Sequence, residues 1–189
     1  MILRNRKEGK GELLNVSEPK QANTGYSWKR DPFFWIYSVL MFVPIIMVFL
    51  FYNYYRLDFC VYVGWTLLVF SIFIILLAGR EFMMKGGAPK GGNIVHTTVL
   101  VDSGVYAVVR HPQYLGFLLF VFGIVLMSQH WLSVLSGVFG TPLFYLDVLR
   151  EEQMSIVKFG DEYKHYMQRV PRMNFLLGVI RLLKRGRRG

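Results

Sequence analysis

The sequence has very little cysteine and few acidic residues, and both shortages narrow its possible functions. The single cysteine, Cys60, excludes an intramolecular disulfide and a cysteine metal cluster. The 4 histidines lack the spacing of metal ligands, so no metal site is predicted. Asp and Glu number 12 against 22 Lys and Arg, which gives a net charge of +10. Because the basic residues flank apolar runs, we expect them to meet anionic membrane lipids rather than nucleic acid.

The common nucleotide-binding motifs are also missing. The glycine-rich stretch 86–92 is neither a P-loop nor a dinucleotide fingerprint, because it lacks the lysine pattern of the first and the strand context of the second. Its glycines and proline do not sustain a helix. We therefore predict a cytoplasmic loop over 80–110.

Uncharged apolar sequence is abundant. Hydrophobic residues make up 53% of the chain and aromatic residues 16%. The runs 33–52 and 59–79 carry no charge, and each is long enough as a helix to cross about 30 Å of hydrocarbon. We predict a first transmembrane hairpin over 33–79, preceded by a polar cytoplasmic segment over 1–32.

A second hairpin is predicted from the runs 114–129 and 131–149, which meet at a Gln-His turn. The segment 151–169 has apolar residues at helical spacing and predicts a cytoplasmic amphipathic helix. The tail, 173–189, is apolar and then basic, which is typical of an interfacial anchor. The predicted class is an all-α integral membrane protein with four spans in two hairpins, and a fifth short or re-entrant span stays open.

The distribution of charge predicts the orientation of the chain. Of the 22 Lys and Arg residues, only Arg56 lies in a turn predicted to face away from both termini. The positive-inside rule then places both termini and the 80–110 loop in the cytoplasm. The expected location is the plasma membrane in a prokaryote and the endoplasmic reticulum in a eukaryote.

Two polar clusters lie at the cytoplasmic ends of the second hairpin, where ionisable groups are costly. One contains Tyr106 and the segment from Arg110 to Tyr114, and the other contains Arg150, Glu151 and Glu152. Pro112 fits the first position of a helix, whose free N–H groups favour an anion. The alternative is a simple proline-initiated helix. The two glutamates also have a simpler interpretation: they begin a helix, where their negative charges interact favourably with the helix dipole.

At these residues the chain resembles the isoprenylcysteine carboxyl methyltransferases and the related membrane phospholipid methyltransferases. The resemblance covers about 99–172, and the order and spacing of its parts make it specific. Those parts are Leu100-Val101, Ser103-Gly104-Val105-Tyr106, Arg110-His111-Pro112-Gln113-Tyr114-Leu115-Gly116, Glu151-Glu152, Phe159-Gly160-Asp161-Glu162-Tyr163 and Val170-Pro171-Arg172.

The resemblance implies S-adenosylmethionine as the methyl donor and a cofactor site with a catalytic hairpin within 111–172. The acceptor implied is the carboxylate of a C-terminal isoprenylcysteine, or a phospholipid amine. The cofactor contacts carried over are Leu100, Val101, Tyr106, His111, Pro112, Gln113, Tyr114 and one of Glu151 and Glu152. His111 and Arg150 are the predicted catalytic residues, although such enzymes place the acceptor-facing arginine where Asp147 and Val148 stand here.

A second enzyme class remains open at this point. Membrane sterol reductases use NADPH and carry a similar R-H-P-x-Y-x-G element, an acidic pair and a K-[FY]-G stretch. This chain is short for such enzymes and has few spans with which to enclose a sterol. A non-catalytic membrane scaffold explains the spans but not the paired motifs.

Overall fold

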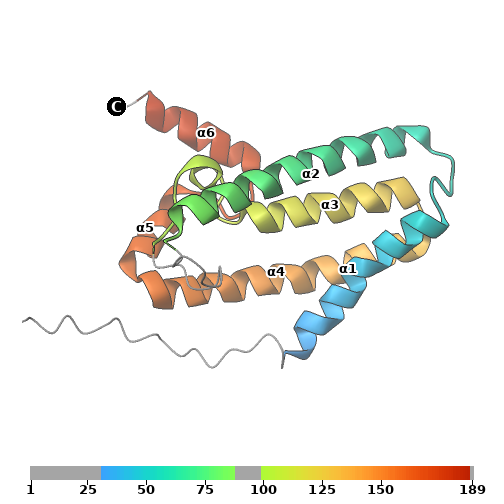
Figure 1. Ribbon diagram of the computed structural model, residues 1–189, viewed down its shortest axis with the longest axis horizontal. Helices are drawn as coiled ribbons and strands as arrows, with labels where there is room; N and C mark the ends of the chain where they lie inside the picture. The colour runs from blue at the N-terminus through green and yellow to red at the C-terminus, as the bar shows by residue number, and fades with distance from the viewer. Residues whose placement is uncertain (1–30, 88–98, 188–189) are drawn as a thin grey trace, which may run out of the picture.

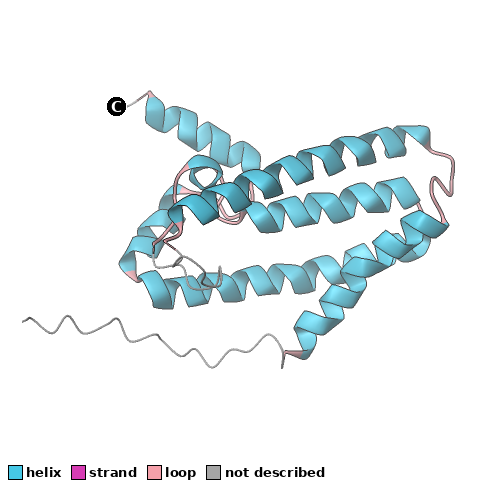
Figure 2. Ribbon diagram, in the orientation of Figure 1, coloured by secondary structure: helices cyan, strands magenta, loops and turns pink. Residues whose placement is uncertain are grey.

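The computed structural model describes residues 31–87 and 99–187. Within these ranges the chain forms six α-helices and one short 3-10 helix, and no strand occurs among them (Figures 1 and 2). The predicted all-α class is confirmed. The predicted cytoplasmic segment 1–32 lies almost wholly outside the described residues, as does part of the predicted 80–110 loop.

Three helices are long and apolar enough to cross a membrane: α1 (Pro32–Leu50), α2 (Asp58–Lys85) and α4 (Trp131–Phe159). At 1.5 Å per residue, their 19, 28 and 29 residues extend about 28, 42 and 44 Å. The apolar α3 (Pro112–Ser128) is shorter, at 17 residues. Large apolar side chains cover the outer faces, and Phe49 is 85% exposed. A surface of this kind fits lipid, and the chain is an integral membrane protein.

The helices do not pack mainly against their hairpin neighbours. Instead α2 lies along α3, and α1 packs across α4 (Figure 1). Small residues explain the first pairing: a Cβ added to Gly64 would lie 2.7 Å from the Gly123 carbonyl oxygen, and one on Gly116 would lie 3.2 Å from the Ser71 carbonyl oxygen. Helices in a membrane associate through such close backbone contact. The α2–α3 pair and the α1–α4 pair are therefore the structural units.

The Gln129 side chain joins the α1–α2 turn to the α3–α4 turn. Gln129, with a left-handed φ of 54°, ends α3 and turns the chain into α4. Its amide nitrogen donates to the Asn53 side chain at 2.8 Å and to the Leu57 carbonyl at 2.9 Å, while its oxygen accepts from the Leu57 N–H at 3.1 Å. The α1–α2 turn is thereby bound to the α3–α4 turn.

Two predicted boundaries are wrong. The helix that contains the second apolar run does not end at Gly79. Instead α2 continues for six residues into the predicted loop, and a Glu81–Lys85 ion pair supports its last turns. The helix predicted to begin at Glu151 is instead the continuation of α4, which ends at Phe159. Nothing between Leu149 and Phe159 interrupts a helix, whereas Gly160 has a φ of +58° and terminates it.

Two short helices follow. The amphipathic prediction over 151–169 corresponds to the end of α4 and to α5 (Asp161–Arg169). The basic tail contains α6 (Phe175–Gly186), capped by the Asn174 side chain, which accepts from the Leu177 N–H at 3.0 Å. Neither α5 nor α6 is long enough to cross a membrane fully.

Candidate functional site

The 3-10 helix η3 (Gly104–Ala107) holds Tyr106 against the end of α2. Gly104 has a φ of +62°, and a Cβ there would lie 2.6 Å from the Glu81 carboxyl carbon. The Tyr106 carbonyl accepts a hydrogen bond of 2.7 Å from the Tyr166 hydroxyl of α5. Burial raises the pKa of the Tyr106 hydroxyl above its ordinary value, and the Glu151 carboxylate raises it further. Tyr106 is therefore a neutral hydrogen-bond donor at physiological pH.

Glu152 is the centre of a buried ionic network. Its Oε1 lies 3.1 Å from Arg110 Nη2 and 3.2 Å from His111 Nε2, and its Oε2 accepts a bond of 2.7 Å from Arg172 Nη2. The Glu152 side chain is 2% exposed and that of Arg110 is 7% exposed. A carboxylate in the middle of α4 gains nothing from a helix N-terminus, so these partners are the reason it is tolerated there.

The backbone strengthens the same junction. The N–H groups of Arg110 and His111 donate to the carbonyls of Pro171 and Arg172, at 3.0 and 3.1 Å. Hydrogen bonding to Glu152 raises the pKa of Arg172, which keeps this guanidinium charged. The segment after α5 is thereby fixed behind the start of α3.

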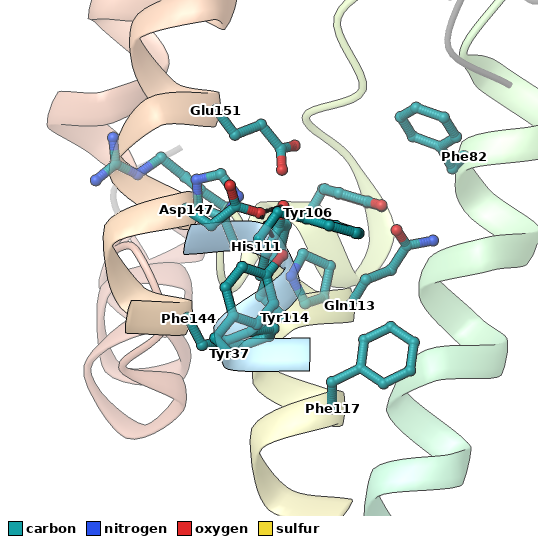
Figure 3. A pocket seen from close by; sticks show the side chains of 13 residues that line it. Tyr37, Phe82, Tyr106, His111, Gln113, Tyr114, Phe117, Phe144, Asp147 and Glu151 are labelled. Atoms are coloured by element: carbon teal, nitrogen blue, oxygen red, sulfur yellow. Dashed lines mark hydrogen bonds between the residues drawn. The ribbon is translucent and has the colours of Figure 1, made fainter. Parts of the chain in front are cut away.

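A cavity of about 360 Å³ opens where α3 begins, between the α2–α3 pair and the α1–α4 pair. Its volume falls in the range of small-molecule sites. Figure 3 shows Glu151 from α4 above Tyr106 and His111, with Phe117 at the opposite end. The lining residues are Phe34, Tyr37, Phe82, Tyr106, Arg110, His111, Pro112, Gln113, Tyr114, Phe117, Phe144, Asp147 and Glu151.

The cavity contains two carboxylates on one face of α4. Asp147 and Glu151 are four residues apart, one helical turn. Asp147 Oδ2 accepts from the Tyr37 hydroxyl at 3.0 Å and faces the Tyr114 hydroxyl at 3.4 Å. The rings of Tyr37 and Tyr114 also contact Phe144, with centroids 5.8 and 5.1 Å apart. The acidic groups are therefore surrounded by aromatic rings.

Six of the predicted site residues line this cavity together, although they come from three separate segments. They are Tyr106, His111, Pro112, Gln113, Tyr114 and Glu151. Of the two glutamates, it is Glu151 that faces the cavity, whereas Glu152 is occupied by the ionic network. Their roles as ligand contacts stay predictions.

Three other predicted residues, Leu100, Val101 and Arg150, are not among the residues that line the cavity. Leu100 packs around the buried cluster of Tyr163 and Tyr166, and Val101 packs with Ala78 behind Tyr106. Both support the cavity wall without lining it.

Arg150, the predicted acceptor contact, points to α1. It forms an ion pair with Asp31, the N-cap of α1, and its guanidinium carbon lies 5.5 Å from the centroid of the Phe33 ring. Arg150 is not among the cavity-lining residues. Its position suits the docking of α1 onto α4.

Several lining residues were missed from the sequence. Phe144 and Asp147 are two of them, and they precede the predicted Glu151 by seven and four residues on one helix. This helical spacing was a usable signal once α4 is known to be continuous. Phe34 and Tyr37 of α1 had no comparable signal, because only the folding of α1 onto α4 brings them to the cavity.

Comparison with known proteins finds similarity in the part of the chain that contains most of the cavity lining. The family model described as "Phospholipid methyltransferase" matches residues 59–162, more than half of the chain. The chain belongs to the phospholipid methyltransferase family. This match includes α2, α3 and the parts of α4 and η3 that line the cavity, while α1 and α6 lie outside it. No solved structure matches the chain.

Curated relatives are protein-S-isoprenylcysteine O-methyltransferases. The protein of Homo sapiens is 38% identical over 85 residues, which is 44% of this chain and 30% of the human protein. That of Schizosaccharomyces pombe is 36% identical over 74 residues, 39% of this chain and 31% of the relative. That of Xenopus laevis is 32% identical over 116 residues, 56% of this chain and 40% of the relative. The matched part of the chain thus spans less than half the length of these relatives. No comparison supports the NADPH-dependent reductase interpretation.

Proposed function

We propose that this protein is a membrane-embedded methyltransferase that moves a methyl group from S-adenosylmethionine to a lipophilic acceptor. One observation carries the proposal: the cavity gathers the R-H-P-x-Y segment, Tyr106 and Glu151, which are distant in sequence and lie inside the family match. The names of the relatives supply the reaction class.

The chemistry of the cavity suits the proposed donor. S-adenosylmethionine carries an ammonium, a sulfonium and a carboxylate. The carboxylates of Glu151 and Asp147 suit its positive groups and ribose hydroxyls, and the surrounding aromatic rings attract a sulfonium. Arg110 also lines the cavity, and its buried Nε and Nη1 have no hydrogen-bond partner among the described residues, which is a reason to expect a ligand or a water molecule as their partner. The charges of donor and cavity are complementary.

The donor supplies a methyl carbon that is already activated for in-line displacement. The chain therefore has mainly to align the two reactants and exclude water. We assign alignment of the donor to Tyr106, Tyr114 and Glu151, and the exclusion of water to the aromatic residues at the other end of the cavity. His111 is held by Glu152 at the start of α3, where it shapes the wall on the donor side.

For the acceptor we propose the carboxylate of a C-terminal isoprenylcysteine, because the names of the relatives specify methyl transfer to an oxygen of a protein isoprenylcysteine. A carboxylate attacks without prior loss of a proton and needs no general base. A phospholipid amine is the second candidate, and the position of Asp147 favours it. An amine must be deprotonated before it attacks, and Asp147 lies within the cavity to accept that proton.

The topology belongs to the same proposal. We place α3 as a fourth span, shielded along its length by α2, with both chain ends and the mouth of the cavity in the cytoplasm. Phe34 and Tyr37 of α1 line the cavity while other side chains of α1 face outward, so the lipid chain of the acceptor would enter beside α1. The membrane is the plasma membrane in a prokaryote and the endoplasmic reticulum in a eukaryote.

Two measurements test the proposal. Purified protein should bind S-adenosylhomocysteine saturably, and Glu151→Gln should weaken that binding about 10- to 100-fold through loss of a charge-assisted hydrogen bond. Labelled methyl should then pass from S-adenosylmethionine to a prenylcysteine or to a phosphatidylethanolamine, and the preferred acceptor decides between the two candidates. Binding of NADPH without S-adenosylhomocysteine would overturn the proposal.

A further inference from the structure

Helix α6 presents an apolar stripe and a basic edge that no described part of the chain covers. Leu176, Ile180 and Leu183 are 75%, 49% and 63% exposed, and their spacing of four and three places them on one face. Arg181 and Lys184 follow along the side of that stripe and are exposed. An apolar stripe with basic residues beside it is typical of a helix at a membrane surface.

The position of α6 agrees with its composition. Its first residue, Phe175, packs edge-on against Phe70 in the middle of α2, with ring centroids 5.9 Å apart. Phe175 also joins the buried cluster around Ile74 and Leu115, between α2 and α3. From there α6 diverges from α2 towards its free end (Figure 1). The helix thus begins beside the middle of a candidate membrane span, and its basic end lies about 18 Å further on.

The backbone of α6 lies directly on the segment that forms the cavity wall. A Cβ added to Gly178 would lie 2.0 Å from the Val108 carbonyl oxygen, so only glycine allows this approach. Val108 lies between Tyr106 and His111, which both line the cavity. The linker that precedes α6 accepts the backbone hydrogen bonds of Arg110 and His111. A shift of α6 therefore moves or releases the cavity wall.

We infer that α6 binds anionic phospholipids of the leaflet at the mouth of the cavity, and that this binding holds the Tyr106–His111 segment in place. The phosphate and acidic headgroups pair with Arg181, Lys184 and Arg187, while the apolar stripe enters the acyl chains. Each basic residue near an anionic surface contributes about fivefold to partitioning, so the three together contribute on the order of a hundredfold. The occupant is a lipid surface, distinct from the acceptor in the cavity.

The lipid contact can be measured without any enzymatic assay. A fluorescent label that reports polarity is attached at Leu183→Cys in a Cys60→Ala background, and the protein is reconstituted in nanodiscs. Nanodiscs of phosphatidylcholine with about 30% phosphatidylglycerol should give a blue-shifted emission relative to phosphatidylcholine alone, and high salt should reverse the shift. The variant R181Q/K184Q/R187Q should lose the shift, whereas R181K/K184R/R187K keeps all three charges and should retain it.

Hydrogen exchange measures the coupling to the cavity wall. Amides of residues 104–111 should exchange at least threefold more slowly with the anionic lipid in the unsubstituted protein, but equally in both lipids in R181Q/K184Q/R187Q. Gly178→Ala should speed their exchange in either lipid, because α6 can no longer lie against Val108. Equal emission and equal exchange in the two lipids would overturn the inference. Neither readout uses the methyl donor, so this result is independent of whether S-adenosylhomocysteine binds.

Discussion

Replacing Glu152 by glutamine should destabilise the fold, whereas the same change at its neighbour should not. The Arg110–Glu152 pair is almost fully buried, and removing one partner of such a pair costs about 3–5 kcal/mol. Glutamine keeps one acceptor oxygen, so the lower value, about 3 kcal/mol, is expected. The Arg172 side chain is 30% exposed, and its contact adds little because solvent screens it. For a chain of this length, about 3 kcal/mol lowers Tm by about 6–12 °C.

The assay is thermal unfolding in one detergent, followed by tryptophan fluorescence, for Glu152→Gln and Glu151→Gln. Glu151 lines the cavity and does not belong to the network around Glu152, so its variant should keep Tm within about 2 °C. It should instead lose affinity for S-adenosylhomocysteine. A Glu152→Gln protein with unchanged Tm and lost S-adenosylhomocysteine binding would show that Glu152, rather than Glu151, contacts the ligand, and the assignment of the pair would be refuted.

Three further substitutions test other parts of the structure. Tyr37→Phe removes the shorter of the two hydrogen bonds to Asp147 and should raise KM for the acceptor at least threefold, with S-adenosylhomocysteine affinity unchanged. An effect on that affinity alone would contradict the placing of α1 on the acceptor side. Gly64→Ala puts a Cβ 2.7 Å from the backbone of α3 and should lower Tm. The control Gly79→Ala puts a Cβ where nothing lies within 4 Å and should raise Tm slightly, because alanine favours the helix. Equal shifts of Tm in the two variants would count against close α2–α3 packing. Arg150→Gln breaks a partly exposed ion pair with Asp31, so it should lower the free energy of unfolding by about 1 kcal/mol or less, and methyl transfer should persist. Complete loss of transfer in a stable variant would restore Arg150 as a catalytic residue.

The helices were predictable because each property that determines them is local. A run of uncharged residues of sufficient length predicts a span from the energetics of the bilayer alone, and Pro112 marks the start of α3 as expected. The boundary at Glu151 was wrong because the change from apolar to polar residues was taken as the end of a helix. A helix ends where the backbone must leave helical angles, and Gly160 is that point.

The shape of the site was less predictable because it depends on how the helices pair. The sequence predicted hairpins, yet glycines on α2 and α3 allow close backbone contact between these two helices. Because α2 pairs with α3, α1 packs on α4, and the Tyr37 hydroxyl lies within hydrogen-bond distance of Asp147. No local pattern in 33–52 distinguishes Tyr37 from an interfacial tyrosine.

Under the proposed function one cavity receives a water-soluble donor and a lipophilic acceptor, and the order of residues along α3 and α4 suits both. On α4, Glu151, Asp147 and Phe144 face the cavity in successive turns, from charged to apolar. On α3, which runs the opposite way, the cavity is lined by Gln113 in the first turn and by Phe117 one turn further along. Both helices therefore change from polar to apolar in the same direction. Under the proposed function we expect the zwitterionic donor at the polar end and an acyl or prenyl chain at the apolar end, with the reacting groups between them, beside Asp147 and Tyr114.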